Sequence, residues 1–317
     1  MPAEPLCLVH LVWAPLGPQA LERFISAYRQ HDPGVRHRLV VLLNGFGSAQ
    51  SLEPWLALLD GIEHEQLRLP EPLLDVAAYR LATAQAGAER YCFMNSYSEP
   101  TTAGWLSKLD EALAAPGVGL AGATGSWAST RSWTAHLLRL PSAYRGVLPP
   151  PAEAIAQFMA VEADRPGGPT PPAPRSALAT ARARLATLAE VPGQTIPFER
   201  FPAYHLRTNA FAIRAHTLAG LRVREVREKR DAYLVENGRN SITRQVQRQG
   251  LRTVVVDRDG EIYDRERWAE SRTFWQGDQE RLLVRDNQTR TYAEADDDRR
   301  RLLSGFAWGH AANPAIP

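Results

Sequence analysis

An apolar run near the end of the first third of the chain stops abruptly at a cluster of polar side chains. Residues 91–94 (Tyr-Cys-Phe-Met) carry no charge, and residues 95–100 read Asn-Ser-Tyr-Ser-Glu-Pro. This pattern is typical of a buried strand in a parallel sheet that ends in polar groups. Ligands bind at the carboxyl ends of such strands in open α/β sheets. The polar cluster is therefore a candidate binding site, although many core strands end in Asn or Ser simply to begin a turn.

The composition excludes several classes of protein. The chain has 37 Lys and Arg against 35 Asp and Glu, so it lacks the charge excess of proteins that bind nucleic acid or anionic membranes. Its two cysteines, Cys7 and Cys92, fall in expected strands and are interpreted as small buried hydrophobes. The apolar segment Leu6–Trp13 is too short for a signal or transmembrane segment. We therefore expect a soluble cytoplasmic protein, with peripheral membrane contact left open.

Strands and helices alternate through the first third of the chain. Apolar runs predict strands at residues 6–13, 37–45, 64–69 and 91–94, and amphipathic stretches predict helices at 19–30, 52–59 and 73–88. Such alternation predicts an α/β fold with a doubly wound, mostly parallel sheet that has helices on both faces. The Gly-x-Gly-x-x-Gly, Gly-x-x-x-x-Gly-Lys-Ser/Thr and Gly-x-Ser-x-Gly motifs of other nucleotide-using and hydrolytic α/β enzymes are missing from the expected places.

The later part of the chain is less regular. Strands are expected at residues 118–123, 204–214 and 251–257, and helices at 215–221 and 231–249. Residues 141–202 hold 12 of the 24 prolines, so we interpret this stretch, with one helix at 175–189, as an insertion that is either a lid or a plain surface excursion. We expect one domain over 1–257 and a helical or irregular C-terminal extension over 258–317, with a solvated helix start at 296–301.

The order of these elements resembles that of the GT-A-fold, family-2-like glycosyltransferases, particularly bacterial enzymes that make rhamnan and other cell-surface polysaccharides. The resemblance rests on the Asn-x-Tyr-x-Glu ending after residue 94, on Thr208–Arg214 and on Gly250–Val256, and it spans roughly residues 6–257. It implies an inverting transfer of a sugar from a nucleotide-sugar donor to a glycan, a lipid-linked acceptor or another hydroxyl acceptor.

The resemblance also implies where the substrates bind. Asp75 corresponds to the acidic nucleoside contact at the start of a helix, unless it is an ordinary carboxylate at a helix N-terminus. Guanidinium groups bind phosphate bidentately, so Arg239 and Arg244 are candidates for binding the diphosphate. The predicted donor-binding residues are Ala14, Asn44, Asp75, Asn95, Tyr97, Arg239 and Arg244, and the predicted acceptor-binding residues are Trp127, Thr208 and Asn209.

Many enzymes of this family bind Mg²⁺ or Mn²⁺ through an aspartate after the fourth strand. Tyr97 stands at that position here, and a neutral phenol is a poor ligand for a hard cation. Glu99 is the nearest carboxylate, and it is the predicted metal ligand if the strand continues to it. The alternative is that arginines stabilise the leaving diphosphate without a metal. We therefore expect weak or absent dependence on a divalent cation.

An inverting transfer needs one general base to accept the proton of the acceptor hydroxyl. The resemblance implies that this carboxylate is Glu236, 14 residues before Gly250, with Asp231 as the second candidate. The alternative for Glu236 is a cap on the helix that follows Asn237.

A non-catalytic GT-A-like protein that binds a nucleotide or glycan is the rival function. Two polar and aromatic clusters, 271–275 and 286–292, either line a sugar site or only pack back on the sheet.

Overall fold

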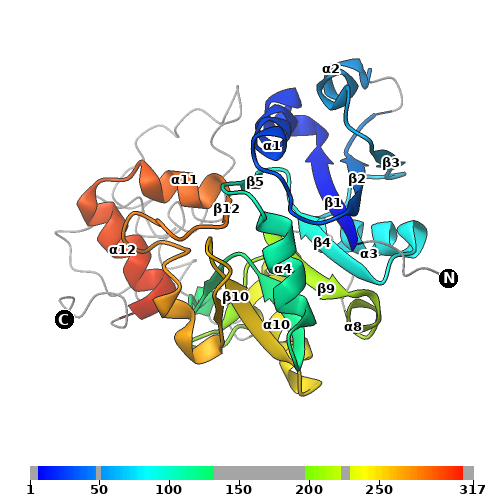
Figure 1. Cartoon of the computed structure of the whole chain (residues 1–317). Coiled ribbons are helices and arrows are strands. Elements are labelled where there is room, and N and C mark those ends of the chain that lie inside the picture. Colours follow the sequence, from blue (N-terminus) through cyan, green and yellow to red (C-terminus); the bar gives the residue numbers. More distant parts are fainter. Residues whose placement is uncertain (1–5, 48–50, 132–196, 223–228, 310–317) are drawn as a thin grey trace, which may run out of the picture.

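The computed structural model describes residues 6–47, 51–131, 197–222 and 229–309 (Figure 1). Its centre is an eight-stranded sheet in the order β11-β10-β6-β9-β4-β1-β2-β3. The strands are β1 (Leu6–Trp13), β2 (His37–Asn44), β3 (Glu65–Arg68), β4 (Arg90–Met94), β6 (Val118–Gly122), β9 (Ala210–Arg214), β10 (Arg252–Val256) and β11 (Ile262–Tyr263). All pair in parallel except β9, which is antiparallel to β4 and β6, and β11, which is antiparallel to β10.

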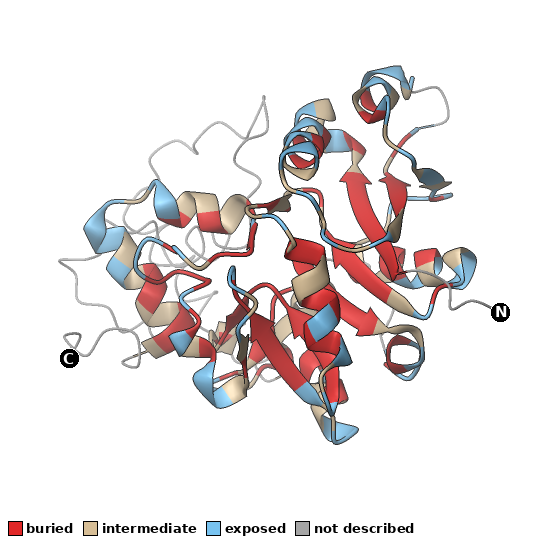
Figure 2. Cartoon of the chain, viewed as in Figure 1, coloured by how far each residue is buried: buried red, intermediate tan, exposed pale blue. Residues whose placement is uncertain are grey.

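Helices cover both faces of this sheet, as the alternation along β1 requires. Cys7, Val9 and Leu11 lie in one core with α3 (Asp75–Ala86), α9 (Lys229–Asn237) and α10 (Ile242–Arg248). Leu6, Leu8 and Val12 lie in the other with α1 (Pro18–Gln30), α2 (Glu53–Leu56) and α4 (Trp105–Ala114). The central strands are buried almost throughout (Figure 2). The predicted α/β class, with a mostly parallel central sheet between helices, is confirmed.

The expected strand at 204–214 is two strands. β8 (His205–Leu206) pairs with β7 (Gly125–Ser126) in a separate two-stranded sheet, and β9 begins after a turn at residues 207–209. β9 then inserts between β4 and β6 against their direction. Its apolar residues 210–213 suit a central strand of either direction, which is why periodicity alone did not predict the antiparallel pairing.

The expected helix at 231–249 is also two helices, α9 and α10. Gly238 separates them, and a Cβ on Gly238 would lie 2.4 Å from the carbonyl oxygen of Leu234, so a side chain there would clash with the backbone. The side chain of Ser241 caps α10 by accepting a hydrogen bond from the amide of Arg244. Glu236 therefore lies in the last turn of α9, and the interpretation that it caps the following helix was wrong.

The C-terminal extension adds strands as well as helices, so β10 is not the final strand. β11 joins the central sheet, and β12 (Val284–Arg285) pairs with β5 (Glu99–Pro100). The expected helix start at 296–301 is confirmed, because Asp296 caps α12 (Asp297–Trp308). The remaining short helices are η1 (Ala14–Leu16), η2 (Ala57–Leu59), α8 (Ala215–Ala219), η4 (Arg265–Glu270) and α11 (Asn287–Ala293).

Two further expectations concern segments only partly described. The helix expected at 175–189 lies outside the described residues, and of the proline-rich stretch only residues 197–202 are described.

The domain division at residue 257 stays a prediction. Cys7 and Cys92 are fully buried and unbridged, as expected. Among the described residues, no helix has the length and apolar character needed to cross a membrane.

The centre of β1 contains a buried histidine that makes stability depend on pH. His10 is fully buried and stacks on Phe24 of α1 with ring centroids 3.7 Å apart. Neither ring nitrogen has a hydrogen-bond partner among the described residues, and burial lowers the pKa of His10 from 6.5 to about 3. Because the unfolded chain binds this proton more readily, acid favours unfolding between those two pH values.

We expect His10→Leu to flatten the loss of stability on acidification. Each pH unit below the unfolded pKa costs about 1.4 kcal/mol for one such group, so the wild type should lose about 2–3 kcal/mol more than the variant between pH 6 and pH 4. Urea unfolding at a series of pH values measures this difference. His216→Gln, at an exposed histidine, is the control and should leave the slope unchanged. Parallel pH curves for the wild type and His10→Leu would contradict the prediction.

Candidate functional site

The chain turns sharply after β4, and a single amide side chain fixes the turn. The Asn95 Oδ1 accepts hydrogen bonds from the amide of Tyr97 (3.0 Å) and from the hydroxyl of Ser98 (2.9 Å). Ser96 connects the same turn to β1, because its hydroxyl donates to the carbonyl of Leu11 and accepts from the amide of Trp13. The strand ends at Met94, so Glu99 does not continue it; Glu99 instead begins β5.

The turn between β8 and β9 packs directly on the turn after β4. The carbonyl oxygen of Asn209 accepts from the amide of Asn95 (3.0 Å) and from the hydroxyl of Ser98 (2.7 Å). The Asn209 Oδ1 accepts from the hydroxyl of Thr124, which follows β6 (2.7 Å). Asn209 is buried, so its hydrogen bonds hold the three turns together at this end of the sheet without solvent contact. The structure thus brings two predicted site residues, Asn95 and Asn209, into direct contact.

Glu236 joins the same group through the neighbouring residue. The amide of Thr208 donates to the Oε1 of Glu236 over 3.2 Å, and the second carboxylate oxygen accepts no hydrogen bond from a described residue. Burial raises the pKa of Glu236, and the charge of Asp75 raises it further, while Arg207 and the Thr208 amide lower it. A carboxylate with a raised pKa and one oxygen without a hydrogen bond from the described residues has the chemistry of a general base.

Asp75, the first residue of α3, lies within electrostatic range of Glu236. Burial raises the pKa of Asp75 from 3.8 to about 6. Asn44 holds the segment that leads into α3, because its side-chain amide donates to the carbonyl of Leu73 (2.6 Å) and accepts from the amide of Leu73 (3.0 Å). Asn44 therefore positions the start of α3 and with it Asp75. Its side-chain oxygen and nitrogen are both hydrogen-bonded to the backbone of Leu73.

A buried ion pair that the sequence analysis missed supports this site. Arg207 donates to Asp286 over 2.6 Å, and the two side chains are only 7% and 0% exposed. The Arg207 guanidinium also lies 4.2 Å from the centre of the Phe274 ring and 3.4 Å from the Thr124 hydroxyl. Asp286 in turn caps α11 by accepting from the amide of Thr289. The pair places a positive charge close enough to lower the pKa of Glu236.

Only part of the signal for this pair was present in the sequence. The clusters 271–275 and 286–292 stood out as polar and aromatic, and they supply Phe274 and Asp286. Arg207 itself had no distinguishing feature in a chain whose positive charge is almost all arginine.

The other predicted site residues have different surroundings. Trp127 packs between Tyr204 and Trp308, with ring centroids 5.4 and 5.6 Å away. Arg244 forms an ion pair with Glu199, and Arg239 is exposed. Ala14 is buried in η1 at the end of β1, and Asp231 lies in the first turn of α9. Glu236 is five positions after Asp231, so the two carboxylates project from different sides of that helix.

The oxygen atoms after β4 do not fit a divalent cation. Glu99 is held by Arg290 (2.6 Å) and Arg23 (3.2 Å), and the Asn95 oxygen already accepts two hydrogen bonds. Within the described parts of the chain, no group of three or more His, Cys, Asp and Glu side chains could hold a metal ion. Glu99 as a metal ligand stays a prediction from the resemblance, and we derive no chemical step through a metal.

Comparisons with known proteins give no match by sequence: no family model matches the chain, and no curated protein does. Among solved structures, the chain is similar to mannosyltransferase PcManGT from Pyrobaculum calidifontis, in complex with GDP-Man and Mn²⁺, at 15% identity and a TM-score of 0.30. It is also similar to residues 1–349 of S. aureus TarS in complex with UDP, at 11% identity and a TM-score of 0.30.

A third similar structure is a putative nucleotide-diphospho-sugar transferase from Desulfovibrio desulfuricans G20, at 17% identity and a TM-score of 0.29. The three matches cover 38%, 37% and 37% of this chain. They cover 36%, 34% and 57% of the other chains, in the same order, so this chain spans only part of the length of each.

We expect Arg207→Met to destabilise the fold strongly, because it leaves the Asp286 carboxylate buried without its cation. Removing one partner of a buried pair costs about 3–5 kcal/mol, which chemical denaturation would measure. Arg252→Met is the matched control: its pair with Asp264 is 42% and 48% exposed and should contribute about 1 kcal/mol or less. The double variant Arg207→Met/Asp286→Asn should recover part of the loss. Equal costs for Arg207→Met and Arg252→Met would show that the buried pair contributes nothing special.

Proposed function

We propose that this protein is a glycosyltransferase that moves a sugar from a nucleotide-sugar donor to a hydroxyl acceptor, with Glu236 as the general base. One observation carries the proposal: Glu236 is held by the Thr208 amide beside the turn after β4 and within electrostatic range of Asp75. Glu236, the candidate base, thus lies near Asp75 and Asn95, two donor-site candidates, at the carboxyl end of β4. The resemblance in the sequence supplies the reaction class.

The chemistry follows from the Glu236 carboxylate. The acceptor hydroxyl oxygen attacks the anomeric carbon of the donor, and the bond from that carbon to the diphosphate oxygen breaks. Glu236 accepts the hydroxyl proton on the oxygen that no described residue occupies, and the nucleoside diphosphate leaves. The raised pKa of Glu236 strengthens it as a base. The products are an inverted glycoside and a nucleoside diphosphate.

The finer parts of the proposal concern the substrates. We place the donor at the ends of β1, β2 and β4, near Ala14, Asp75, Asn95 and Tyr97, with Arg239 as the exposed cation available to the diphosphate. We place the acceptor beside Thr208, next to the proposed base. The acceptor class is a glycan or lipid-linked hydroxyl compound, and the pathway class is polysaccharide or surface-glycan synthesis in the bacterial cytoplasm.

Glu236→Gln should keep the shape of the side chain and remove its ability to accept a proton. General bases contribute about 10²–10⁴-fold, so turnover should fall at least a hundredfold, measured as release of nucleoside diphosphate. Donor affinity should change by less than about threefold, because the base acts on the acceptor. Asp231→Asn is the control and should keep most of the activity. Normal turnover by Glu236→Gln would transfer the role to Asp231, whereas a panel of nucleotide sugars that gives no binding would contradict the proposed function itself.

We expect donor binding to depend weakly on divalent cations, because Tyr97 stands where the family has an aspartate and Glu99 is paired with two arginines. The measurement is the shift in melting temperature caused by the best nucleotide sugar of the panel, with EDTA and with Mn²⁺. The two shifts should agree closely. Loss of binding in EDTA that Mn²⁺ restores would show that a carboxylate of this chain does bind the metal.

A further inference from the structure

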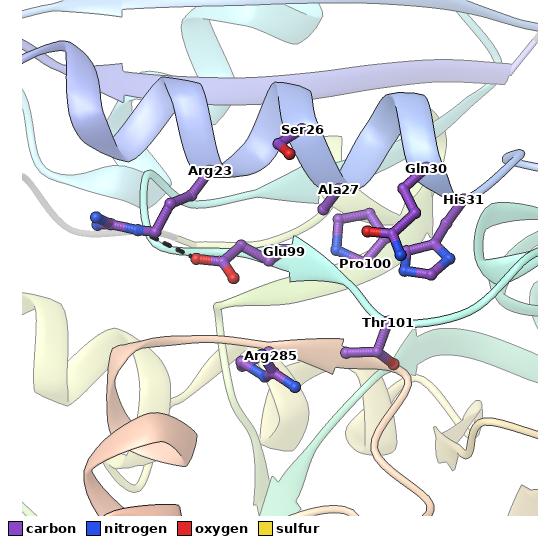
Figure 3. Close-up of a pocket in the computed structure, with 9 residues that line it drawn as sticks. All are labelled: Arg23, Ser26, Ala27, Gln30, His31, Glu99, Pro100, Thr101 and Arg285. Carbon is purple, nitrogen blue, oxygen red and sulfur yellow. Dashed lines mark ion pairs between the residues drawn. The ribbon is translucent and has the colours of Figure 1, made fainter.

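A polar pocket lies between α1 and the β5–β12 pair, and Glu236 is not among its lining residues (Figure 3). Its volume is about 370 Å³, within the range of small-molecule sites. The helix side contributes Arg23, Ser26, Gln30 and His31 among its lining residues, and the strand side contributes Glu99, Thr101 and Arg285. Glu99 is the only one of these residues that the sequence analysis assigned to a site.

The pocket carries an excess of positive charge. Glu99 is its only carboxylate, and Glu99 is already bound by Arg23 (3.2 Å) and by Arg290 behind it (2.6 Å). Arg285 lies directly opposite Glu99 in the β5–β12 register, so the two side chains share one face of the strand pair. The side chain of Arg285 nevertheless forms no ion pair or hydrogen bond with a described residue. Counting Arg290 beside it, this region has three arginines and one glutamate, so its positive charges outnumber its negative charge among the described residues.

The helix side of the pocket supplies uncharged hydrogen-bonding groups. The side chains of Ser26, Gln30 and His31 form no hydrogen bond with any of the described residues, and they line the hollow opposite Arg285 (Figure 3). Thr101 differs, because its hydroxyl donates to the carbonyls of Leu282 and Leu283. A hydroxyl, an amide and an imidazole near guanidinium groups match a ligand that carries both hydroxyls and an anion.

We propose that this pocket binds a small hydroxylated anion whose phosphate or carboxylate lies between Arg23 and Arg285. Guanidinium groups bind both oxyanions in bidentate geometry, and Arg285 has no competing partner in the described chain. Ser26, Gln30 and His31 then contact the hydroxyl groups of the ligand. This site goes beyond the proposed glycosyl transfer and does not depend on it, because neither Glu236 nor a nucleotide contributes to the pocket.

Isothermal titration calorimetry of the full chain at constant ionic strength tests the proposal with four probes: inorganic phosphate, glucose 1-phosphate, glucuronate and glucose. We expect saturable binding of one equivalent of glucose 1-phosphate, weaker binding of inorganic phosphate, and no binding of glucose. Binding of glucuronate in place of glucose 1-phosphate would identify a carboxylate as the anion. Failure of all three anions to bind would overturn the proposal.

Variants locate the binding. Arg285→Gln and Arg23→Gln should each weaken the anion about fivefold, since a partly exposed charge pair contributes about 1 kcal/mol. Arg299→Gln, an exposed arginine on α12, removes the same charge elsewhere and should change nothing. Glu99→Gln frees Arg23 and should tighten binding, a gain that misfolding cannot produce. Equal losses in all three arginine variants would overturn the proposal. A chain that binds the anion here but binds no nucleotide sugar would contradict only the glycosyltransferase.

Discussion

The arrangement of the candidate site depends on three consecutive residues between β8 and β9. Arg207 pairs with Asp286, the amide of Thr208 holds Glu236, and Asn209 bonds to the turn after β4. They can make these contacts only because β9 inserts between β4 and β6, which brings its first residues to the edge where β4 and β6 end. Reversing or removing β9 would separate all three contacts at once.

The buried charge of Arg207 explains why the C-terminal extension is part of the site. A guanidinium with so little exposure needs an anion and hydrogen-bond acceptors in place of water. Phe274 covers one face of it, and Asp286 supplies the anion. Both come from beyond residue 257, where the sequence suggested that the main domain ends. The extension therefore supplies the charge balance around Glu236 as well as packing.

The sequence was informative where local rules decide the structure. The runs that form β1, β2 and β4 are mostly apolar and mostly buried, and their parallel pairing follows from the intervening helices. Pairing direction at β9 was not predictable, because a short apolar run satisfies either direction. The break at Gly238 was missed because glycine is tolerated inside many helices, and here it is required only by the nearby carbonyl of Leu234.

The candidate site shows the same limit at the level of side chains. Asn95 could be selected from its place at a strand end and Glu236 from the resemblance, and both lie beside the turn that contains Thr208. Roles that depend on long-range partners could not: the neutralisation of Glu99 requires Arg290, which is 191 residues away in the chain. The sequence therefore indicated Glu99 as a candidate metal ligand. In the structure its carboxylate is paired with Arg23 and Arg290.

The segment after β4 also connects the candidate site with the polar pocket between α1 and the β5–β12 pair. Ser98 donates to the carbonyl of Asn209 on the Glu236 side, and the next residue, Glu99, faces Arg23 and the pocket. Successive residues of an extended chain point in opposite directions, so one short segment contributes to both places. An anion that displaces Glu99 from Arg23 would act one residue away from the hydrogen bond that fixes the β4 turn, while Arg290 would still hold the Glu99 carboxylate. Because Arg290 also pairs with Glu99, Glu99 keeps a cation partner when the proposed anion binds Arg23.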